Sequence, residues 1–241
     1  MTFSIVASRP QAGMLGVATS SRSLAAGAAV PFVKASVGAI ASQSAGNPYL
    51  GIDGLRLLEQ GVPPEEVLSQ LLRQDPGKEI RQVLIVDSEG DAAAFTGSQC
   101  ISWAGHRLGD GYVVGGNILA SEDVIEGMAR AFENSGDKKL PERLMLALEA
   151  GQAAGGDRRG KQSAGLLLMD KTENPYFDLR VDDHEEPVQE LRRIFEMKKG
   201  AREAHGGSRP TREAPLLPGA LERFLKIKAS IEQEASTTKE R

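Results

Sequence analysis

Cysteine and histidine are scarce in this chain of 241 residues. Cys100 is the single cysteine, so no disulfide bond can form within the chain, and this usage fits a reducing compartment. Cys100 and His106 flank the segment ISWAG, but a lone cysteine is usually a small buried hydrophobe, and the three histidines have no companion asparagine or aspartate signature. The composition therefore excludes a disulfide scaffold and disfavours a cysteine nucleophile.

Long apolar runs and an excess of basic charge are also missing. No segment approaches the roughly 20 apolar residues of a membrane-spanning helix. The start of the chain has no basic region followed by a long apolar stretch, so we expect no signal peptide and a cytoplasmic protein. The 33 acidic and 29 basic residues give a net charge of −4, whereas nucleic-acid binders usually carry a basic excess. We expect neither a membrane nor a nucleic acid as partner.

Aromatic residues make up 5% of the chain, while glycine occurs 27 times. A core with few aromatic side chains has to be built from alanine, valine, leucine and isoleucine, with backbones approaching closely at glycine. This composition favours stacked sheets with tight turns over a helical bundle. The length allows one large domain, or one domain with an appendage.

Hydrophobic periodicity predicts groups of strands separated by helices. The order is strands, two helices, strands, two helices, strands and one helix, which indicates antiparallel or mixed sheets covered by helices rather than a doubly wound parallel sheet. The predicted strands are residues 2–8, 15–21, 37–45, a hairpin over 81–97, 111–120, 163–170 and 176–183. The predicted helices are residues 48–61, 63–74, 121–136, 140–154 and 186–200.

The composition changes near residue 198, which predicts a domain over residues 1–197 and a Gly-, Pro- and charge-rich linker over 198–218. Residues 219–235 then predict an amphipathic tail helix. We expect this helix to dock on its own domain or on a partner subunit, since its polar face is mixed rather than basic as on membrane-surface helices. The residues that share its apolar face are Leu221, Phe224, Leu225 and Ile231.

The segment GGDRRGKQ, residues 155–162, matches the spacing of a phosphate-binding loop. Gln162 stands where that motif needs serine or threonine, and the segment runs from a predicted helix into a strand, the reverse of such a loop. We therefore predict no nucleotide site here. Two readings of Asp157, Arg158 and Arg159 stay open: a guanidinium fork for a carboxylate-bearing substrate, or a solvated turn whose aspartate pairs internally.

Asp182 and His184 share one face of a predicted strand, while Asp183 points away. Two candidate ligands fall short of the three or four that a metal site usually has, so we predict no metal. A metal-assisted hydrolase using Asp182 and His184 is the least favoured alternative. The chain also has no G-x-S-x-G motif for a serine nucleophile.

Thr2 becomes the first residue if Met1 is removed, and a small second residue favours that removal. A free α-amine has a pKa of about 7.7–8.0, so it can accept a proton from the hydroxyl of the same residue. Nucleophile and base are then one residue, and no histidine is needed. Asn117 and the backbone amides of Gly115 and Gly116 are candidate oxyanion donors. The alternative, a strand that merely begins with threonine, stays open.

Further polar residues lie at the ends of strands that we expect beside the first strand. They are Ser21, Arg22, Gln43 and Asn47. With the Asp157–Arg159 loop they would line a substrate pocket, and the basic and amide groups suit a small, carboxylate-bearing amide. For each of them, a hydrogen bond in a turn or at a sheet edge is the alternative role.

Several segments together resemble a bacterial family catalogued as domain of unknown function 1028. They are MTFSIVA, GVATSSRSLAAGAAVPF, ASQSAGNPYLG, WAGH, GNILAS, EAGQAAGGDRRGKQSA and DLRVDDH. The resemblance extends over about residues 1–197, in order, and excludes the linker and tail helix. It implies the fold of the N-terminal-nucleophile (Ntn) hydrolases, a four-layer αββα sandwich of two antiparallel sheets between helix layers.

The wider Ntn superfamily cleaves amide bonds through an acyl-enzyme formed on an N-terminal Thr, Ser or Cys, and Thr2 stands at that position. The resemblance thus implies an amidohydrolase, and we expect it to act on a small molecule without a cofactor. The alternative is a catalytically silent binding or scaffold protein that keeps the sandwich. A homodimer is a further expectation, because the chain has many small residues and an extra helix.

Overall fold

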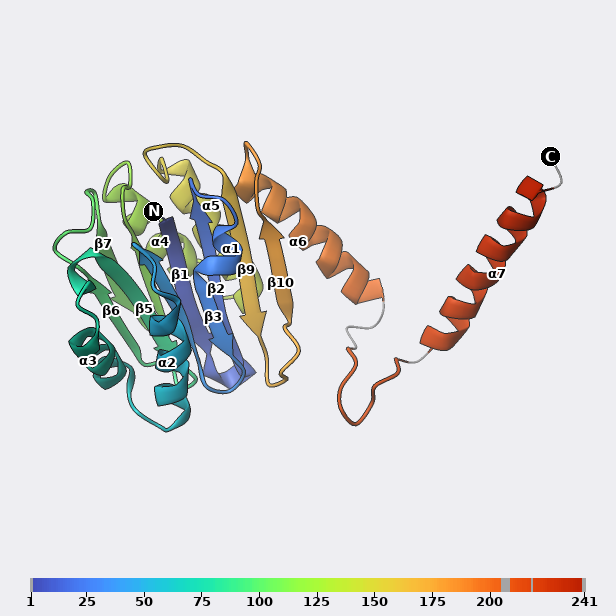
Figure 1. The fold of residues 1–241 in the computed structure, drawn as a ribbon, viewed down its shortest axis with the longest axis horizontal. Coiled ribbons are helices and arrows are strands. Elements are labelled where there is room, and N and C mark those ends of the chain that lie inside the picture. The colour runs from blue at the N-terminus through green and yellow to red at the C-terminus, as the bar shows by residue number, and fades with distance from the viewer. Residues whose placement is uncertain (1, 205–208, 218, 240–241) are drawn as a thin grey trace. The chain divides into compact units, whose positions relative to one another are not determined.

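The computed structural model describes residues 2–204, 209–217 and 219–239 (Figure 1). Its strands form two antiparallel sheets. The larger sheet has the order β10-β9-β2-β1-β8-β7 and the smaller one the order β3-β4-β5-β6. The strands of the larger sheet are β1 (Thr2–Arg9), β2 (Met14–Ser21), β7 (Gly105–Gly109), β8 (Tyr112–Gly116), β9 (Ser163–Met169) and β10 (Phe177–Val181). Those of the smaller sheet are β3 (Pro31–Lys34), β4 (Gly38–Ser44), β5 (Arg81–Asp87) and β6 (Ala92–Thr96).

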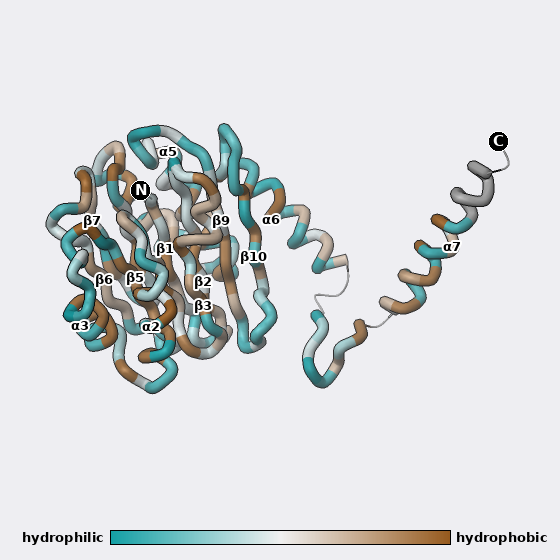
Figure 2. Tube along the Cα trace, viewed as in Figure 1, coloured by the Kyte–Doolittle hydropathy of each residue, from teal (hydrophilic) through white to brown (hydrophobic). Residues whose placement is uncertain are grey.

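Helices cover the outer faces of both sheets. They are α2 (Pro48–Glu59), α3 (Pro64–Gln74), α4 (Asp123–Glu133), α5 (Leu140–Ala153) and α6 (Pro187–Ala204). The short helix α1 (Ala26–Ala29) lies instead on the intersheet side, where Ala26 belongs to the core between the sheets. A last helix, α7 (Ala220–Lys239), follows. Figure 2 shows apolar residues along the strands and polar residues in most of the connecting loops.

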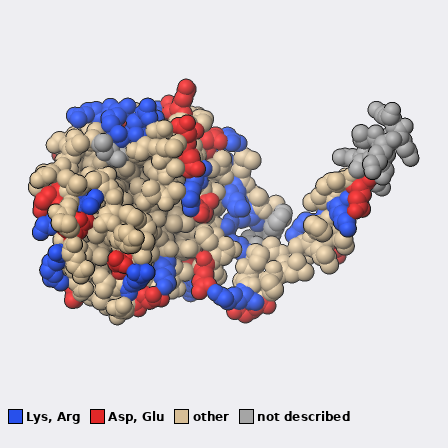
Figure 3. All heavy atoms as spheres, in the orientation of Figure 1, with Lys and Arg blue, Asp and Glu red and all other residues tan. Residues whose placement is uncertain are grey.

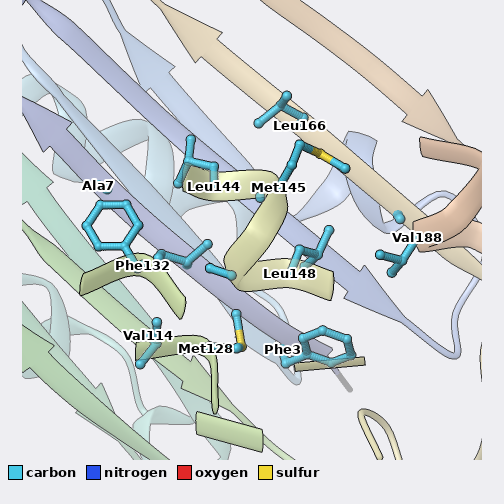
Figure 4. Close-up of a cluster of buried hydrophobic side chains, with 14 of the residues drawn as sticks. Phe3, Ala7, Val114, Met128, Phe132, Leu144, Met145, Leu148, Leu166 and Val188 are labelled. Atoms are coloured by element: carbon cyan, nitrogen blue, oxygen red, sulfur yellow. The ribbon is translucent and has the colours of Figure 1, made fainter. Parts of the chain in front are cut away.

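Three hydrophobic layers separate four layers of secondary structure. Strand alternation directs Phe3 and Ile5 to the core under α4, α5 and α6, which Figure 4 shows in close-up, and Val6 to the space between the sheets. On β4, Ala41 faces the same intersheet space, whereas Ile40 packs against α2 and α3. The arrangement confirms the predicted α+β class, an αββα sandwich of two antiparallel sheets between helix layers.

β1 is an interior strand of the larger sheet, with β2 on one side and β8 on the other. Thr2 pairs with Ser21 of β2, and Phe3 pairs with Gly116 of β8. Asn117, the next residue after β8, donates its backbone N–H to the Thr2 carbonyl at 3.1 Å. The first residue of β1 therefore lies between Ser21 and Asn117 at one end of the sandwich, where Figure 1 marks the N-terminus.

A close backbone approach seats α1 on β9. A Cβ atom added to Gly165 would lie 2.6 Å from the Cα atom of Gly27, a distance that no relaxed packing permits. Glycine at these two positions is therefore what lets α1 contact the larger sheet directly. Such pairs are what the high glycine content predicts for a core with few aromatic residues.

Several predicted boundaries need correction. Two strands were not predicted: β3, which has four residues and begins at a proline, and β7, which reads GHRLG and has little apolar character. β8 ends at Gly116, so Asn117 lies beyond the strand. β10 ends at Val181, so Asp182 and His184 lie in the following loop. The prediction that these two residues share a strand face is therefore wrong.

The chain divides into two compact units, Met1–Phe195 and Glu196–Arg241. In the first unit, α6 contributes Val188, Leu191 and Phe195 to the core. In the second, the apolar residues predicted to share a face of the tail helix are 52–62% exposed. No helix within the described residues combines the length and the apolar character needed to cross a membrane.

Candidate functional site

Thr2 faces the space between the two sheets. Its side chain shares a strand face with Ser4 and Val6, and Val6 belongs to the intersheet core. Thr2 is 3% exposed, and its hydroxyl donates to the Ser21 hydroxyl at 3.3 Å. The same alternation directs Ser21 inward. The intersheet space is apolar along most of its length and becomes polar at the end that holds Thr2.

A buried network of hydroxyl and amide groups connects the two sheets at this end. The Ser4 hydroxyl is 2.8 Å from that of Thr19 and donates to Gln43 Oε1 at 2.6 Å. Gln43 Nε2 donates to Gln82 Oε1 at 2.9 Å, and Asn117 Nδ2 donates to the same oxygen at 2.8 Å. Five side chains from β1, β2, β4, β5 and the residue after β8 thus meet in one network.

Backbone carbonyls determine how these amides are oriented. Gln82 Nε2 donates to the carbonyls of Gly105 and Gly116 at 3.0 and 2.9 Å, and Gln43 Nε2 lies 3.2 Å from that of Gly115. A carbonyl oxygen can only accept, so both glutamines must present their nitrogen atoms to these positions. Gln82 Oε1 is left to accept from Asn117, whose own carbonyl oxygen Oδ1 is buried without a hydrogen-bond partner.

An unpartnered buried acceptor is unusual, because it costs about 1–3 kcal/mol relative to a satisfied one. Asn117 is fully buried, so bulk water does not compensate for this loss. Asn117 Nδ2 carries two hydrogens, and one contact uses one of them. The residue therefore presents one free acceptor and one further N–H beside Thr2.

Ile118, directly after Asn117, has φ +50°, a left-handed conformation that a β-branched residue rarely adopts and that costs about 1–3 kcal/mol. Two backbone hydrogen bonds hold it there. Its N–H donates to the Ile101 carbonyl, and its carbonyl accepts from the Arg158 N–H, each at 2.9 Å. Backbone strain of this kind concentrates at functional sites. It directs the chain away from β8 immediately after Asn117.

The turn at Asp157 lies against both neighbours of Thr2. Asp157 is 4% exposed, and its carboxylate accepts the backbone N–H of Arg22, the residue after Ser21, at 3.0 Å. It also accepts the backbone N–H of Arg159 at 2.9 Å and forms an ion pair with the Arg159 guanidinium. Arg158 contacts the residue after Asn117, as described above. The structure thus brings the predicted Arg22 and Asp157–Arg159 positions to the end of the sandwich that holds Thr2.

The basic groups at this end differ in how far they are neutralised. Arg159 pairs with Asp157, and Lys161 pairs with Glu186. Arg22 Nη1 instead donates to the neutral side chain of Gln162 at 2.7 Å, and the side chain of the exposed Arg158 forms no hydrogen bond or ion pair with the described residues. Figure 3 shows lysine and arginine side chains gathered over this end of the sandwich. Within the part of the chain that the structure describes, the guanidinium groups of Arg22 and Arg158 therefore have no carboxylate partner.

Two predicted positions have different surroundings from those expected. Gln43 belongs to β4, which faces β1 from the opposite sheet instead of lying beside it, yet Gln43 still reaches Ser4. Asn47 is engaged elsewhere: its side chain caps α2 by accepting from the Tyr49 N–H at 3.1 Å and contacts Asp75 at 3.3 Å.

Gln82 is a central residue of the site that the sequence prediction missed. The sequence signal for Gln82 is modest: it is the one polar side chain on the inward face of the otherwise apolar segment QVLIV.

Burial lowers the pKa of His106, which contacts the network through Thr96 Oγ1 at 2.8 Å. This imidazole is therefore neutral near pH 7.

The loop after β10 holds Asp182 and His184, the two candidate metal ligands. His184 Nδ1 accepts the backbone N–H of Glu186 at 2.9 Å. The described part of the chain contains no group of three or more His, Cys, Asp or Glu side chains placed to hold a metal ion. The loop at 155–162 runs from α5 into β9, the reverse of a phosphate-binding loop, as predicted.

Fold and site together define an α+β sandwich with a threonine at the start of an interior strand, facing a polar intersheet network. The model of the Family of unknown function (DUF1028) matches residues 2–191. The chain belongs to this family. No curated protein matches it.

Two solved structures are similar to the chain. A crystal structure of a protein from Silicibacter pomeroyi that carries the same family model is 32% identical, with a TM-score of 0.75 over 81% of this chain and 88% of that one. Anbu (ancestral beta-subunit) from Yersinia bercovieri is 11% identical, with a TM-score of 0.39 over 87% of this chain and 99% of its own.

Proposed function

We propose that the protein is an amide hydrolase of the N-terminal-nucleophile type, with Thr2 as the nucleophile once Met1 has been removed. The observation that carries the proposal is the position of Thr2. It begins an interior strand, directs its hydroxyl between the sheets, and lies beside Ser21 and Asn117. Removal of one residue places a primary amine and a hydroxyl on the same carbon skeleton at this point.

The chemistry needs no other base. The α-amine takes the proton of the Thr2 hydroxyl as Oγ1 bonds to the substrate carbonyl carbon. Collapse of the tetrahedral intermediate breaks the C–N bond, and the ammonium returns the proton to the leaving amine, which leaves an ester on Thr2. Water then attacks this ester, the α-amine takes a proton from the water, and that proton passes to Oγ1 as the ester bond breaks.

Asn117 suits stabilisation of the oxyanion. Because Gln82 accepts one N–H of its side chain, the amide is held in one orientation, and the second N–H of Nδ2 stays available. A donor that is already oriented stabilises developing charge without the cost of reorganising. Loss of one such donor costs about 2.7–4 kcal/mol in a comparable hydrolase.

Arg22 and Arg158 support a carboxylate-bearing substrate. Asp157 braces the turn and is itself neutralised by Arg159, so it competes little for the other two guanidinium groups. Arginine binds carboxylates in bidentate fashion, which would orient the scissile amide toward Thr2. We propose a small amide with a carboxylate close to the bond that is cleaved.

A binding protein without turnover is the second candidate, and one observation favours it. Thr2 is 3% exposed, and its hydroxyl already donates to Ser21. A silent protein would keep this closed arrangement, whereas a hydrolase must admit a substrate to Oγ1. The two candidates differ in whether Thr2 can be acylated.

The test is acylation by a β-lactone, which acylates hydroxyl groups and does not require the natural substrate. Intact mass first establishes that Met1 is absent. We expect one acyl group per chain on the N-terminal peptide, no label in Thr2→Ala, and retained label in the matched control Thr2→Ser. Unlabelled wild-type protein, or label that persists in Thr2→Ala, would contradict the role of Thr2 as the nucleophile. The binding protein without turnover would then be the remaining candidate.

A further inference from the structure

Gln82 lies at the centre of the buried network without touching Thr2. The two hydrogens of its Nε2 face the carbonyls of Gly105 and Gly116, with Thr96 Oγ1 also 2.8 Å from that nitrogen. Its carbonyl oxygen therefore faces the other way, toward Asn117. A flip of the Asn117 amide would bring two oxygen atoms to about the 2.8 Å that now separates Nδ2 from Oε1. Gln82 thereby selects one of the two orientations of Asn117.

The selected orientation leaves Asn117 Oδ1 as a buried acceptor without a partner. Buried acceptors nearly always have a hydrogen-bond donor in folded proteins, so we expect a donor for Asn117 Oδ1. The backbone N–H of Asn117 already donates to the Thr2 carbonyl, and the side chains of both residues contact inward-facing residues, Ser21 for Thr2 and Gln82 for Asn117. The α-amine of Thr2 is a donor that appears at this place when Met1 is removed.

We propose that Gln82 is a positioning residue: through Asn117 Oδ1 it orients the α-amine of Thr2 so that the nitrogen lone pair is directed at Oγ1. The inference rests on the proposed function, because the amine exists only without Met1. A hydrogen bond to Asn117 Oδ1 uses one amine N–H and fixes rotation about the N–Cα bond. The charged and titratable groups around this point are Arg22, Asp157, Arg158 and Arg159 in the adjacent turns, and His106 beyond Thr96.

The experiment is an NMR titration of the α-amine in Met1-free protein with isotope-labelled threonine, followed at the Thr2 Cα, so that no substrate is required. An acceptor favours the charged form of an amine, so Asn117→Leu should lower the pKa of the Thr2 amine by about one pH unit. Gln82→Met should lower it in the same direction, because Asn117 is then free to turn. Asn117→Asp should raise it, because a carboxylate replaces the neutral acceptor.

Two variants serve as controls. Thr96→Val removes one contact of Gln82 but leaves both glycine carbonyls, so the titration should match wild type. Gln82→Glu, with a proton on the oxygen that faces the glycine carbonyls, retains an oxygen that accepts from Asn117 Nδ2, so the amine pKa should not fall. If Gln82→Met does not fold, Gln82→Glu carries the test, and a fall in the amine pKa in that variant overturns the positioning role.

The outcomes separate this inference from the hydrolase. An unchanged titration in Asn117→Leu overturns the amine contact, even if Thr2 is acylated. A change in Asn117→Leu without one in Gln82→Met removes the role of Gln82 alone. The expected shifts in a protein that resists acylation would support the inference and reject the hydrolase, whereas Met1 retained on the purified protein rejects both.

Discussion

At the residue scale, the carboxylate of Asp157 joins the two loops on either side of Thr2. It accepts backbone N–H groups from Arg22 and Arg159 and pairs with the Arg159 guanidinium while almost fully buried. The sequence left two roles open for this segment, a substrate site or an internal Asp–Arg pair. Asp157 and Arg159 form the internal pair, and the proposal for substrate binding therefore rests on Arg22 and Arg158.

Asp157→Ala removes the acceptor of two backbone N–H groups and leaves Arg159 without its partner. We expect the free energy of unfolding to fall by about 2–4 kcal/mol, measured by urea denaturation. Asp178→Ala is the matched control, because Asp178 also pairs with an arginine two residues away but at an exposed site. That variant should stay within about 0.5 kcal/mol of wild type. Equal losses in the two variants would contradict the bracing role of Asp157.

At the scale of elements, Asp75 joins α2, α3 and β5. It ends α3, contacts the α2 cap Asn47, and pairs with Arg81 at the start of β5. Burial raises the pKa of the Asp75 carboxyl, but hydrogen bonds from Arg81, the Gly77 N–H and Asn47 outweigh burial and hold that pKa below its ordinary value. Gln82, the second residue of β5, directly follows Arg81 of this junction.

The lowered pKa fixes the sign of a pH effect. The folded state binds the proton of Asp75 more weakly than the unfolded state, so its stabilisation is present above the ordinary pKa of about 3.9 and is lost as pH falls through the lowered value. Asp75→Asn should be about 1–3 kcal/mol less stable at pH 7, with the difference from wild type shrinking toward pH 2 in urea titrations.

Asp53 supplies the control for that measurement. It pairs with Arg56 on the exposed face of α2, so Asp53→Asn should remain within about 0.5 kcal/mol of wild type at every pH. A difference between Asp75→Asn and wild type that stays constant from pH 7 to pH 2 would contradict the assigned cause.

At the scale of the whole molecule, the core of the first unit is complete by Phe195. A chain ended after Ala204 keeps every residue of that core, so its Tm should lie within about 2 °C of the full chain by circular dichroism. A chain ended after Glu186 loses Val188, Leu191 and Phe195. Each such loss costs about 2–5 kcal/mol, which together exceeds the stability of most domains, so this chain should not fold. A cooperative unfolding transition in the chain ended after Glu186 would contradict the conclusion that α6 is required for folding.

The sequence was sufficient for the class of fold. Alternation in residues 2–8, the hairpin over 81–97 and the helix pairs each follow from local patterns of apolar residues, and the structure confirms them. The short strands β3 and β7 were missed because four or five residues with proline, glycine or charge carry no such pattern. The same limit applies to the end of β10, where polar residues continue the alternation into a loop.

What the sequence determined by itself is the alternation that turns Thr2, Ser4, Gln43 and Gln82 inward, since side-chain direction in a strand follows from its period of two. Tertiary structure alone decided that β4 and β5 face β1 from a second sheet, so that Gln43 meets Ser4 across 39 positions and Gln82 meets Asn117 across 35. It also decided that Asn47 caps a helix instead of joining them. The physical reason is that periodicity reports which side of an element is buried, whereas the partner met there depends on how the layers stack.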